Sequence, residues 1–179
     1  MGDREVGEAC NELKLPAPTT VKVRARVAAL LDAEPSAEAK AIRQRPLDEK
    51  PYWDIERARI GQSRKVPVEL VVNAYPVARA EIDADGAFHE VAFDVPVKKS
   101  SWIALRVLPS SHTNPVFVVV GDKPIRASRK SAEWCLKSVD QCWSQKERAI
   151  RPSEQEEARK AYDLARQAYR KIREESAEN

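Results

Sequence analysis

Histidine, glycine and long apolar runs are scarce in this chain of 179 residues. Only two histidines are present, His89 and His112, so few imidazole ligands are available for a metal centre. Five glycines leave little material for phosphate-cradling loops. No window approaches the roughly 18 apolar residues of a membrane span. The first fifteen residues lack the basic and apolar regions of a signal peptide. We therefore expect no membrane partner, and the localisation is left open.

The net charge and the cysteine spacing exclude one class of partner and one kind of cross-link. Lys and Arg number 31 and Asp and Glu 28, a net charge of +3, and the two signs are interspersed. Nucleic-acid binders concentrate positive charge on one face, so we expect no nucleic acid partner. Cys135 and Cys142 on one helix would lie about 10 Å apart, too far for a disulfide. Together with Cys10 they are interpreted as buried free thiols.

The first part of the chain alternates between apolar and polar residues. Val21, Val23 and Ala25 share one side of a predicted strand, with Lys22 and Arg24 on the other, which is typical of a strand with one buried face. Further strands are predicted at 52–60, 66–72, 75–82, 88–95, 103–107, 116–120 and 124–126, and a helical turn at 36–43. Asp85-Gly86 is the strongest hairpin signal. The fold class is therefore mainly β, an antiparallel β-sandwich over residues 1–126.

The period changes after residue 126. Apolar residues then recur at spacings of three and four, as on one helix face, at Ala132, Cys135, Leu136, Val139, Cys142 and Trp143. A second such stripe follows Pro152, and Ser153 with Glu156 matches a capping box that would start the second helix. The sequence thus predicts a C-terminal α-helical hairpin over 127–179, packed on or beside the sandwich.

One polar turn is a candidate site. Ser111, His112, Thr113 and Asn114 lie between two predicted strands, in a run of turn-forming residues. Catalysis by a Ser/His pair needs an orienting carboxylate and a strained nucleophile turn, and neither is recognisable here. No catalytic or metal-binding residue is therefore assigned. The turn is interpreted as a structural corner or a contact to another domain, with Asn114 making buried hydrogen bonds.

Aromatic residues suggest a second candidate site. Trp53 and Trp102, with Tyr52 nearby and Arg106 on the same predicted strand as Trp102, could form a platform on which a sugar or another ligand stacks. The alternative is that these rings pack in the core. His89 is interpreted as a half-exposed strand residue, and Arg126, Arg129 and Lys130 as either a solvated surface or an anion site.

Several segments resemble a known family. Val68-Glu69-Leu70-Val71-Val72-Asn73, Ser101-Trp102-Ile103-Ala104-Leu105-Arg106 and Ser111-His112-Thr113-Asn114-Pro115-Val116 are similar to the C-terminal region of bacterial CehA/McbA-type metallohydrolases of the PHP (polymerase and histidinol phosphatase) superfamily. The tail segments Ser131-Ala132-Glu133-Trp134-Cys135 and Asp140-Gln141-Cys142-Trp143 look like the terminal helices of the same proteins.

The resemblance implies a full-length protein with an N-terminal barrel that binds two or three divalent ions and activates water for hydrolysis. No position of this chain matches those ligand motifs, so no cofactor is expected here, and a divalent metal only in a full-length relative. The implied function is a non-catalytic accessory region that supports a catalytic domain or oligomerisation. Its implied partners are that N-terminal catalytic domain or a second copy. The alternative is a stand-alone carbohydrate- or ligand-binding sandwich.

Overall fold

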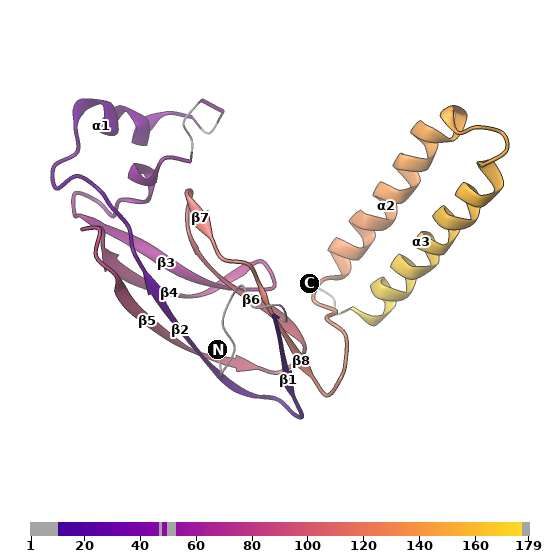
Figure 1. The fold of residues 1–179 in the computed structure, drawn as a ribbon, viewed down its shortest axis with the longest axis horizontal. Coiled ribbons are helices and arrows are strands. Elements are labelled where there is room, and N and C mark those ends of the chain that lie inside the picture. Colours follow the sequence, from indigo (N-terminus) through magenta and orange to yellow (C-terminus); the bar gives the residue numbers. More distant parts are fainter. Residues whose placement is uncertain (1–10, 47, 50–52, 177–179) are drawn as a thin grey trace. The chain divides into compact units, whose positions relative to one another are not determined.

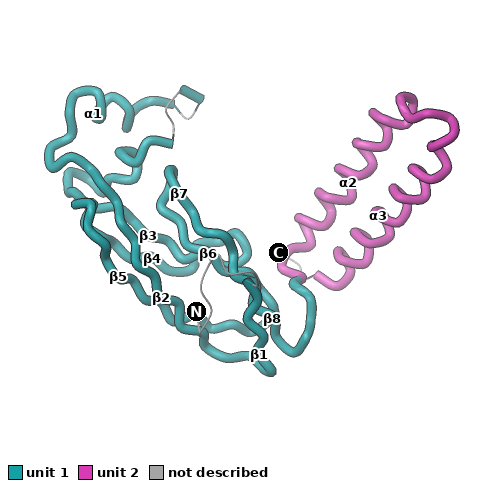
Figure 2. The backbone as a smooth tube through the Cα atoms, viewed as in Figure 1, with its two compact units in different colours: residues 1–125 teal, residues 126–179 magenta. Residues whose placement is uncertain are grey.

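The computed structural model describes residues 11–46, 48–49 and 53–176. The chain divides into two compact units, Met1–Ile125 and Arg126–Asn179 (Figure 2). The first, called the two-sheet unit below, holds all the strands, and the second holds two long helices (Figure 1). In the described part, no helix is both long and apolar enough to span a membrane.

Among the described residues of the two-sheet unit, eight strands form two sheets. A mixed six-stranded sheet has the order β1-β8-β6-β3-β4, with β7 also paired to β6, and β2 and β5 form a two-stranded sheet. The strands are β1 (Glu12–Leu15), β2 (Thr19–Val27), β3 (Lys65–Val72), β4 (Tyr75–Asp83), β5 (His89–Val97), β6 (Ser101–Val107), β7 (Ser111–His112) and β8 (Val116–Val120).

One strand pair contradicts the predicted purely antiparallel sandwich. β1 runs parallel to β8, with Glu12 opposite Phe117 and Leu15 opposite Val120. Short links between neighbouring strands favour antiparallel pairing. β1 and β8 are instead separated in the sequence by nearly the whole unit, so no short link fixes their relative direction. The pairs formed by β2 to β8 are otherwise antiparallel, and they include β7, a short strand within the segment predicted as a turn.

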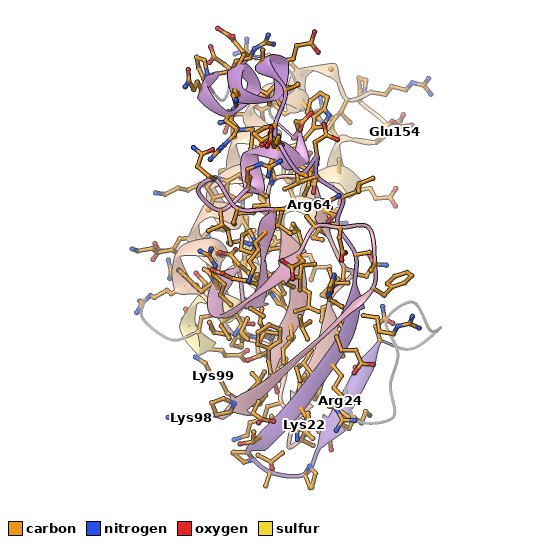
Figure 3. All side chains as sticks on the ribbon, turned by 90° about the vertical axis from the view of Figure 1, so that its left-hand side faces the viewer. Lys22, Arg24, Arg64, Lys98, Lys99 and Glu154 are labelled. Atoms are coloured by element: carbon orange, nitrogen blue, oxygen red, sulfur yellow. The ribbon has the colours of Figure 1, made fainter. Side chains whose placement is uncertain are left out.

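A single apolar core joins the two sheets. In β5 the buried residues are Val91, Phe93, Val95 and Val97, and they alternate with exposed ones. In β6, Ile103, Leu105 and Val107 are buried in the same alternation. All of these residues belong to one cluster with Val21 and Val23 of β2 and Val66, Val68 and Leu70 of β3. Lys22 and Arg24 of β2 are exposed, at the same end of the unit as Lys98 and Lys99 (Figure 3).

The tight hairpin of the unit is Asn73-Ala74, not Asp85-Gly86. Asn73 and Ala74 both have positive φ, 50° and 76°, as a two-residue type I′ turn requires, and they join β3 to β4. Asp85-Gly86 connects β4 of one sheet to β5 of the other, so the hairpin predicted there is wrong. The Asp85-Gly86 connection is closed by hydrogen bonds from Ala87 N and His89 Nε2 to Asp85 Oδ1, both 2.9 Å long.

Two predicted strands are absent from the described residues. Within 52–60 the chain forms a 3-10 helix, η1 (Ile55–Ala58), whose first turn is capped by Asp54. Glu56 and Arg59 are both buried there and form an ion pair, which a strand at this position could not provide. Residues 124–126 have no regular structure. Tyr52 lies outside the described residues. The helical turn predicted at 36–43 is confirmed as α1 (Ala37–Gln44), with Ser36 as its N-cap.

The predicted C-terminal helix pair is confirmed. α2 (Arg129–Lys146) and α3 (Gln155–Glu175) contact one another, and a short 3-10 turn, η2 (Glu147–Ala149), follows α2. The rings of Trp143 and Tyr162 meet between the helices with centroids 4.9 Å apart. The capping box predicted at Ser153 is wrong: α3 begins after Glu154, which makes no side-chain cap.

Candidate functional site

An open groove of about 710 Å³ lies in the two-sheet unit. It is formed by β6, by the 108–115 segment that contains β7, and by residues at the ends of β3 and β8. Its aliphatic lining consists of Val71, Ala74, Ala104, Leu105, Leu108, Pro109 and Pro115. Open pockets with a mainly apolar lining and a few polar groups are the usual form of ligand and peptide sites. We call this site the β6 groove.

The alternation of β6 determines which side chains reach the groove. Ile103 of this strand is buried among core residues, and so is Leu105, although Leu105 also contributes to the floor of the groove. Trp102, Ala104 and Arg106, at the intervening positions, are half-buried on the other face of the sheet, and they line the groove. Because successive side chains of a strand point to opposite faces, a strand that packs the core on one side presents an indole and a guanidinium on the other.

Trp102 has an aromatic neighbour on the adjacent strand. β6 pairs with β8 so that Trp102 stands opposite Phe117, and both line the groove. Phe117 is 43% exposed. Directly opposed residues on one face of a sheet have Cβ atoms about 4.5–5.5 Å apart. Trp102 and Phe117 are therefore neighbouring aromatic residues in the lining of the groove.

Asn73 fixes the backbone of Trp102 from the hairpin turn. The N–H of Trp102 donates to Asn73 Oδ1, and the N–H of Asn73 donates to the Trp102 carbonyl oxygen, both at 3.1 Å. Asn73 Nδ2 also donates to the hydroxyl of Ser101 at 3.1 Å. With three hydrogen bonds, one turn residue holds the start of β6 against the β3–β4 hairpin.

Arg106 enters the groove as half of an ion pair. Its Nε donates to Oε2 of Glu69 at 2.7 Å, and Glu69 stands opposite Arg106 in the β3–β6 register. The two side chains are 27% and 21% exposed. A pair so close to solvent contributes at most about 1 kcal/mol to stability. Among the described lining residues, Arg106 alone carries a permanent charge, and Glu69 neutralises it.

The polar turn forms one wall of the groove and is hydrogen-bonded to β6. Thr113 exchanges two bonds with Leu105: its N–H donates to the Leu105 carbonyl at 2.9 Å, and its hydroxyl accepts from the Leu105 N–H at 3.1 Å. Ser111 and His112 pair with Val107 and Arg106 as β7. The side chain of Asn114 is exposed, so the expectation that it makes buried hydrogen bonds is wrong. Thr113 makes the bonds to β6 instead.

His112 is arranged as part of the wall. Its Nδ1 lies 3.1 Å from the carbonyl oxygen of Thr113, to which it donates. A histidine acting as general base is oriented by a carboxylate or similar acceptor while its other nitrogen meets the nucleophile. Here the orienting partner is the backbone of the neighbouring residue. Among the described residues no group of three or more His, Cys, Asp or Glu side chains could hold a metal ion.

Six of the seven predicted site residues line this one groove: Trp102, Arg106, Ser111, His112, Thr113 and Asn114. The two candidate sites of the sequence are therefore a single site. Trp53 is not among the lining residues; it is 49% exposed and precedes η1.

Glu69, Asn73 and Phe117 were not recognised from the sequence. Asn73 could have been found through its place in a two-residue turn. Phe117 could have been found as the outward position of an apolar strand. Nothing in the sequence pairs Glu69 with Arg106.

Comparisons with known proteins add no family. The chain matches no family model, no curated protein and no solved structure. The function must therefore be argued from the groove itself.

Proposed function

We propose that the two-sheet unit is a non-catalytic accessory module that recognises its partner through the β6 groove. The observation that carries this proposal is the meeting of the predicted polar turn and of Trp102 and Arg106 from the predicted platform in one open, largely apolar groove. Aromatic and aliphatic residues in a concave site supply binding energy, and a few fixed polar groups supply orientation. The groove offers both, while its histidine is bonded to a backbone carbonyl.

The partner proposed first is a catalytic domain. It rests on the resemblance of the β6 and 111–116 segments to the C-terminal region of CehA/McbA-type metallohydrolases, in which such a region accompanies a metal-binding barrel. The finer fold assignment, a β-sandwich of that family's kind, belongs to the same proposal. The neutralised Arg106–Glu69 pair suits this partner, because an unpaired charge in a protein interface would carry a desolvation penalty.

The test is binding of the purified chain to the catalytic domain of a CehA/McbA-type hydrolase, measured by calorimetry. Trp102→Ala should weaken binding at least about tenfold, since buried aromatic residues dominate interface energies. Trp53→Ala is the matched control: it removes the same side chain from the same unit, but outside the groove. Equal affinity of wild type and Trp102→Ala, or equal loss in both variants, would contradict the proposal.

A carbohydrate is the second candidate partner, and the Trp102–Phe117 aromatic pair beside the Arg106–Glu69 ion pair favours it. Sugar rings stack their apolar face on aromatic rings, while their hydroxyls need adjacent donors and acceptors. A neutral oligosaccharide fits better than an acidic one, because Glu69 already compensates Arg106. Titration of neutral and acidic oligosaccharides, followed by tryptophan fluorescence, separates this candidate from the first. Saturable binding of a neutral sugar that is lost in Trp102→Ala would favour it.

A further inference from the structure

The α2–α3 hairpin carries an exposed surface that its own two helices do not cover. Within the described part of this unit only Ala132 and Ser176 are buried. Two helices of 18 and 21 residues normally gain most of their stability from packing an apolar face on another element. Trp134 of α2 is 69% exposed and Leu164 of α3 is 68% exposed. Contiguous exposed apolar area marks an interaction surface, and on this hairpin such area surrounds Trp134.

A shallow hollow of about 400 Å³ lies on this surface, and Trp134 is one of the residues that line it. Small residues from both helices line it, Cys135 and Ser138 from α2 and Ala161 and Ala165 from α3, with Tyr162 and Tyr169 also contributing. None of its described lining residues carries a permanent charge. We call Trp134 and this hollow together the hairpin face.

The hairpin face is self-complementary. The exposed indole of Trp134 forms part of the wall of a concave site whose other residues are mostly small, so one patch carries both an exposed ring and a hollow. A two-fold interface brings the same patch of two copies together, so that each projection meets the other copy's hollow. Because the hollow has no permanent charge, two copies can approach without like-charge repulsion. A different protein would supply either a side chain that fills the hollow or a hollow that accepts Trp134, whereas a second copy of this chain supplies both.

The size of the face also suits a dimer. Helix α2, with 18 residues, is about 27 Å long, and two packed helices are about 20 Å wide. The broad side of the hairpin that carries the hairpin face thus measures roughly 500 Å², and two copies that bury all of it cover about 1,000 Å² in total, the lower limit of specific interfaces. Two hairpins packed in this way form a four-helix bundle, the common solution for helices with one apolar face.

We propose that the chain forms a two-fold homodimer through the hairpin face, with Trp134 of each copy seated in the hollow of the other. This inference does not depend on what the β6 groove binds, since the groove is formed by the two-sheet unit alone. Its experiment is therefore separate from the binding experiments described above, and either proposal can fail without the other.

The test is the mass of the full chain in solution, measured by sedimentation equilibrium from about 1 to 200 µM. The chain has a mass of 20.1 kDa, and we expect a concentration-dependent shift to twice that mass. Ala161→Glu places a carboxylate in the hollow. Ala161 is exposed in the single copy, so the hairpin itself can accommodate the change. We expect its dimer dissociation constant, and that of Trp134→Ala, to rise at least about tenfold.

Gln167→Glu is the matched control, because it adds the same carboxylate at an exposed position of α3 that does not line the hollow. It should dimerise like the wild type, and circular dichroism should show equal helix content in all variants. A wild type that stays at 20.1 kDa up to the highest concentration overturns the proposal. A dimer that persists unchanged in both Ala161→Glu and Trp134→Ala overturns it as well.

Discussion

Asn73 and Trp102 bind each other's backbone: Trp102 N–H donates to Asn73 Oδ1, and Asn73 N–H donates to the Trp102 carbonyl, each at 3.1 Å. Asn73 adopts a φ of 50°, which Asn tolerates better than most residues. One residue thus closes the β3–β4 hairpin and positions the indole of the β6 groove. The stability of the hairpin and the geometry of the groove are therefore linked.

Asn73→Ala should destabilise the two-sheet unit by about 1–3 kcal/mol, because it removes both side-chain hydrogen bonds and adds strain at positive φ. Asn73→Asp retains the acceptor for Trp102 and loses only the donor to Ser101, so it should cost less. Urea unfolding followed by circular dichroism measures both. Equal destabilisation of the two variants would show that the hydrogen bond from Trp102 N–H to Asn73 Oδ1 contributes little to stability.

Ala74→Gly should stabilise the same turn by about 0.5–1 kcal/mol. Ala74 has a φ of 76°, a region that costs an L-residue energy and that glycine enters freely, and Asn-Gly is the preferred type I′ pair. The thermal midpoint should rise. Ala80→Gly within β4 is the control, and its midpoint should fall. A fall in both would show that the turn strain is negligible.

The buried Glu56–Arg59 pair should be sensitive to loss of either charge. Arg59 also donates to the carbonyls of Ser63 and Asp32, at 3.0 and 2.8 Å, so it joins three segments. Glu56→Gln leaves a buried guanidinium uncompensated and should cost about 3 kcal/mol. In the exposed Arg79–Glu81 pair, Glu81→Gln should change the unfolding free energy by less than about 0.5 kcal/mol. Similar urea midpoints for Glu56→Gln and Glu81→Gln would contradict the larger contribution expected of the buried pair.

Asp85 should make stability fall in acid. The hydrogen bond from His89, and next that from Ala87 N–H, hold the pKa of Asp85 below its ordinary value. A lowered folded-state pKa adds stability above the unfolded pKa of about 3.9, and this contribution disappears as the pH falls through the folded pKa. Asp85→Asn should thus be less stable than wild type at pH 5–7, by a margin that shrinks toward about pH 2. A margin that did not change over this range would contradict the prediction.

Cys142 should be the more reactive thiol of the hairpin. Its Sγ lies 3.2 Å from Tyr162 Oη, and this hydrogen bond, followed by the charge of nearby Lys146, lowers the pKa of the Cys142 thiol. Because the thiolate is the nucleophile, Tyr162→Phe should move the pH midpoint of Cys142 alkylation upward and leave Cys135 unchanged. Peptide mapping after iodoacetamide treatment of dilute protein measures both sites. An unchanged pH midpoint for Cys142 alkylation would contradict the expectation that the hydrogen bond with Tyr162 lowers the pKa of this thiol.

The sequence was informative where burial acts along a single strand. Val91, Phe93 and Val95 alternate with polar residues because one face of β5 is buried, and that pattern is visible without knowing the partner strand. The same rule predicted Arg106 on the side of β6 opposite to Ile103 and Leu105, and the structure places Trp102 on that side as well. Local period therefore predicted most strands and the two main helices.

Pairing between distant segments could not be read in this way. The parallel β1–β8 pair depends on two strands separated by the rest of the unit, and the role of Asp85-Gly86 depends on which sheet receives β5. The Glu56–Arg59 pair misled the prediction at 52–60, since its charged residues are buried rather than exposed. The groove likewise depends on strand register, because the pairing of β6 with β3 and β8 places Glu69 opposite Arg106 and Phe117 opposite Trp102.

Whether the β6 groove binds a partner can be measured by mapping ligand contacts with NMR. Amide shifts of the ¹⁵N-labelled chain would be followed on adding the catalytic domain of a CehA/McbA-type hydrolase, and separately on adding neutral oligosaccharides. We expect one of them to shift the backbone amides of Ala104, Arg106 and Thr113 and the indole N–H of Trp102, all from residues that line the groove. Trp102→Ala should abolish the effect. Shifts confined to other parts of the chain, or no shift with either partner, would contradict it.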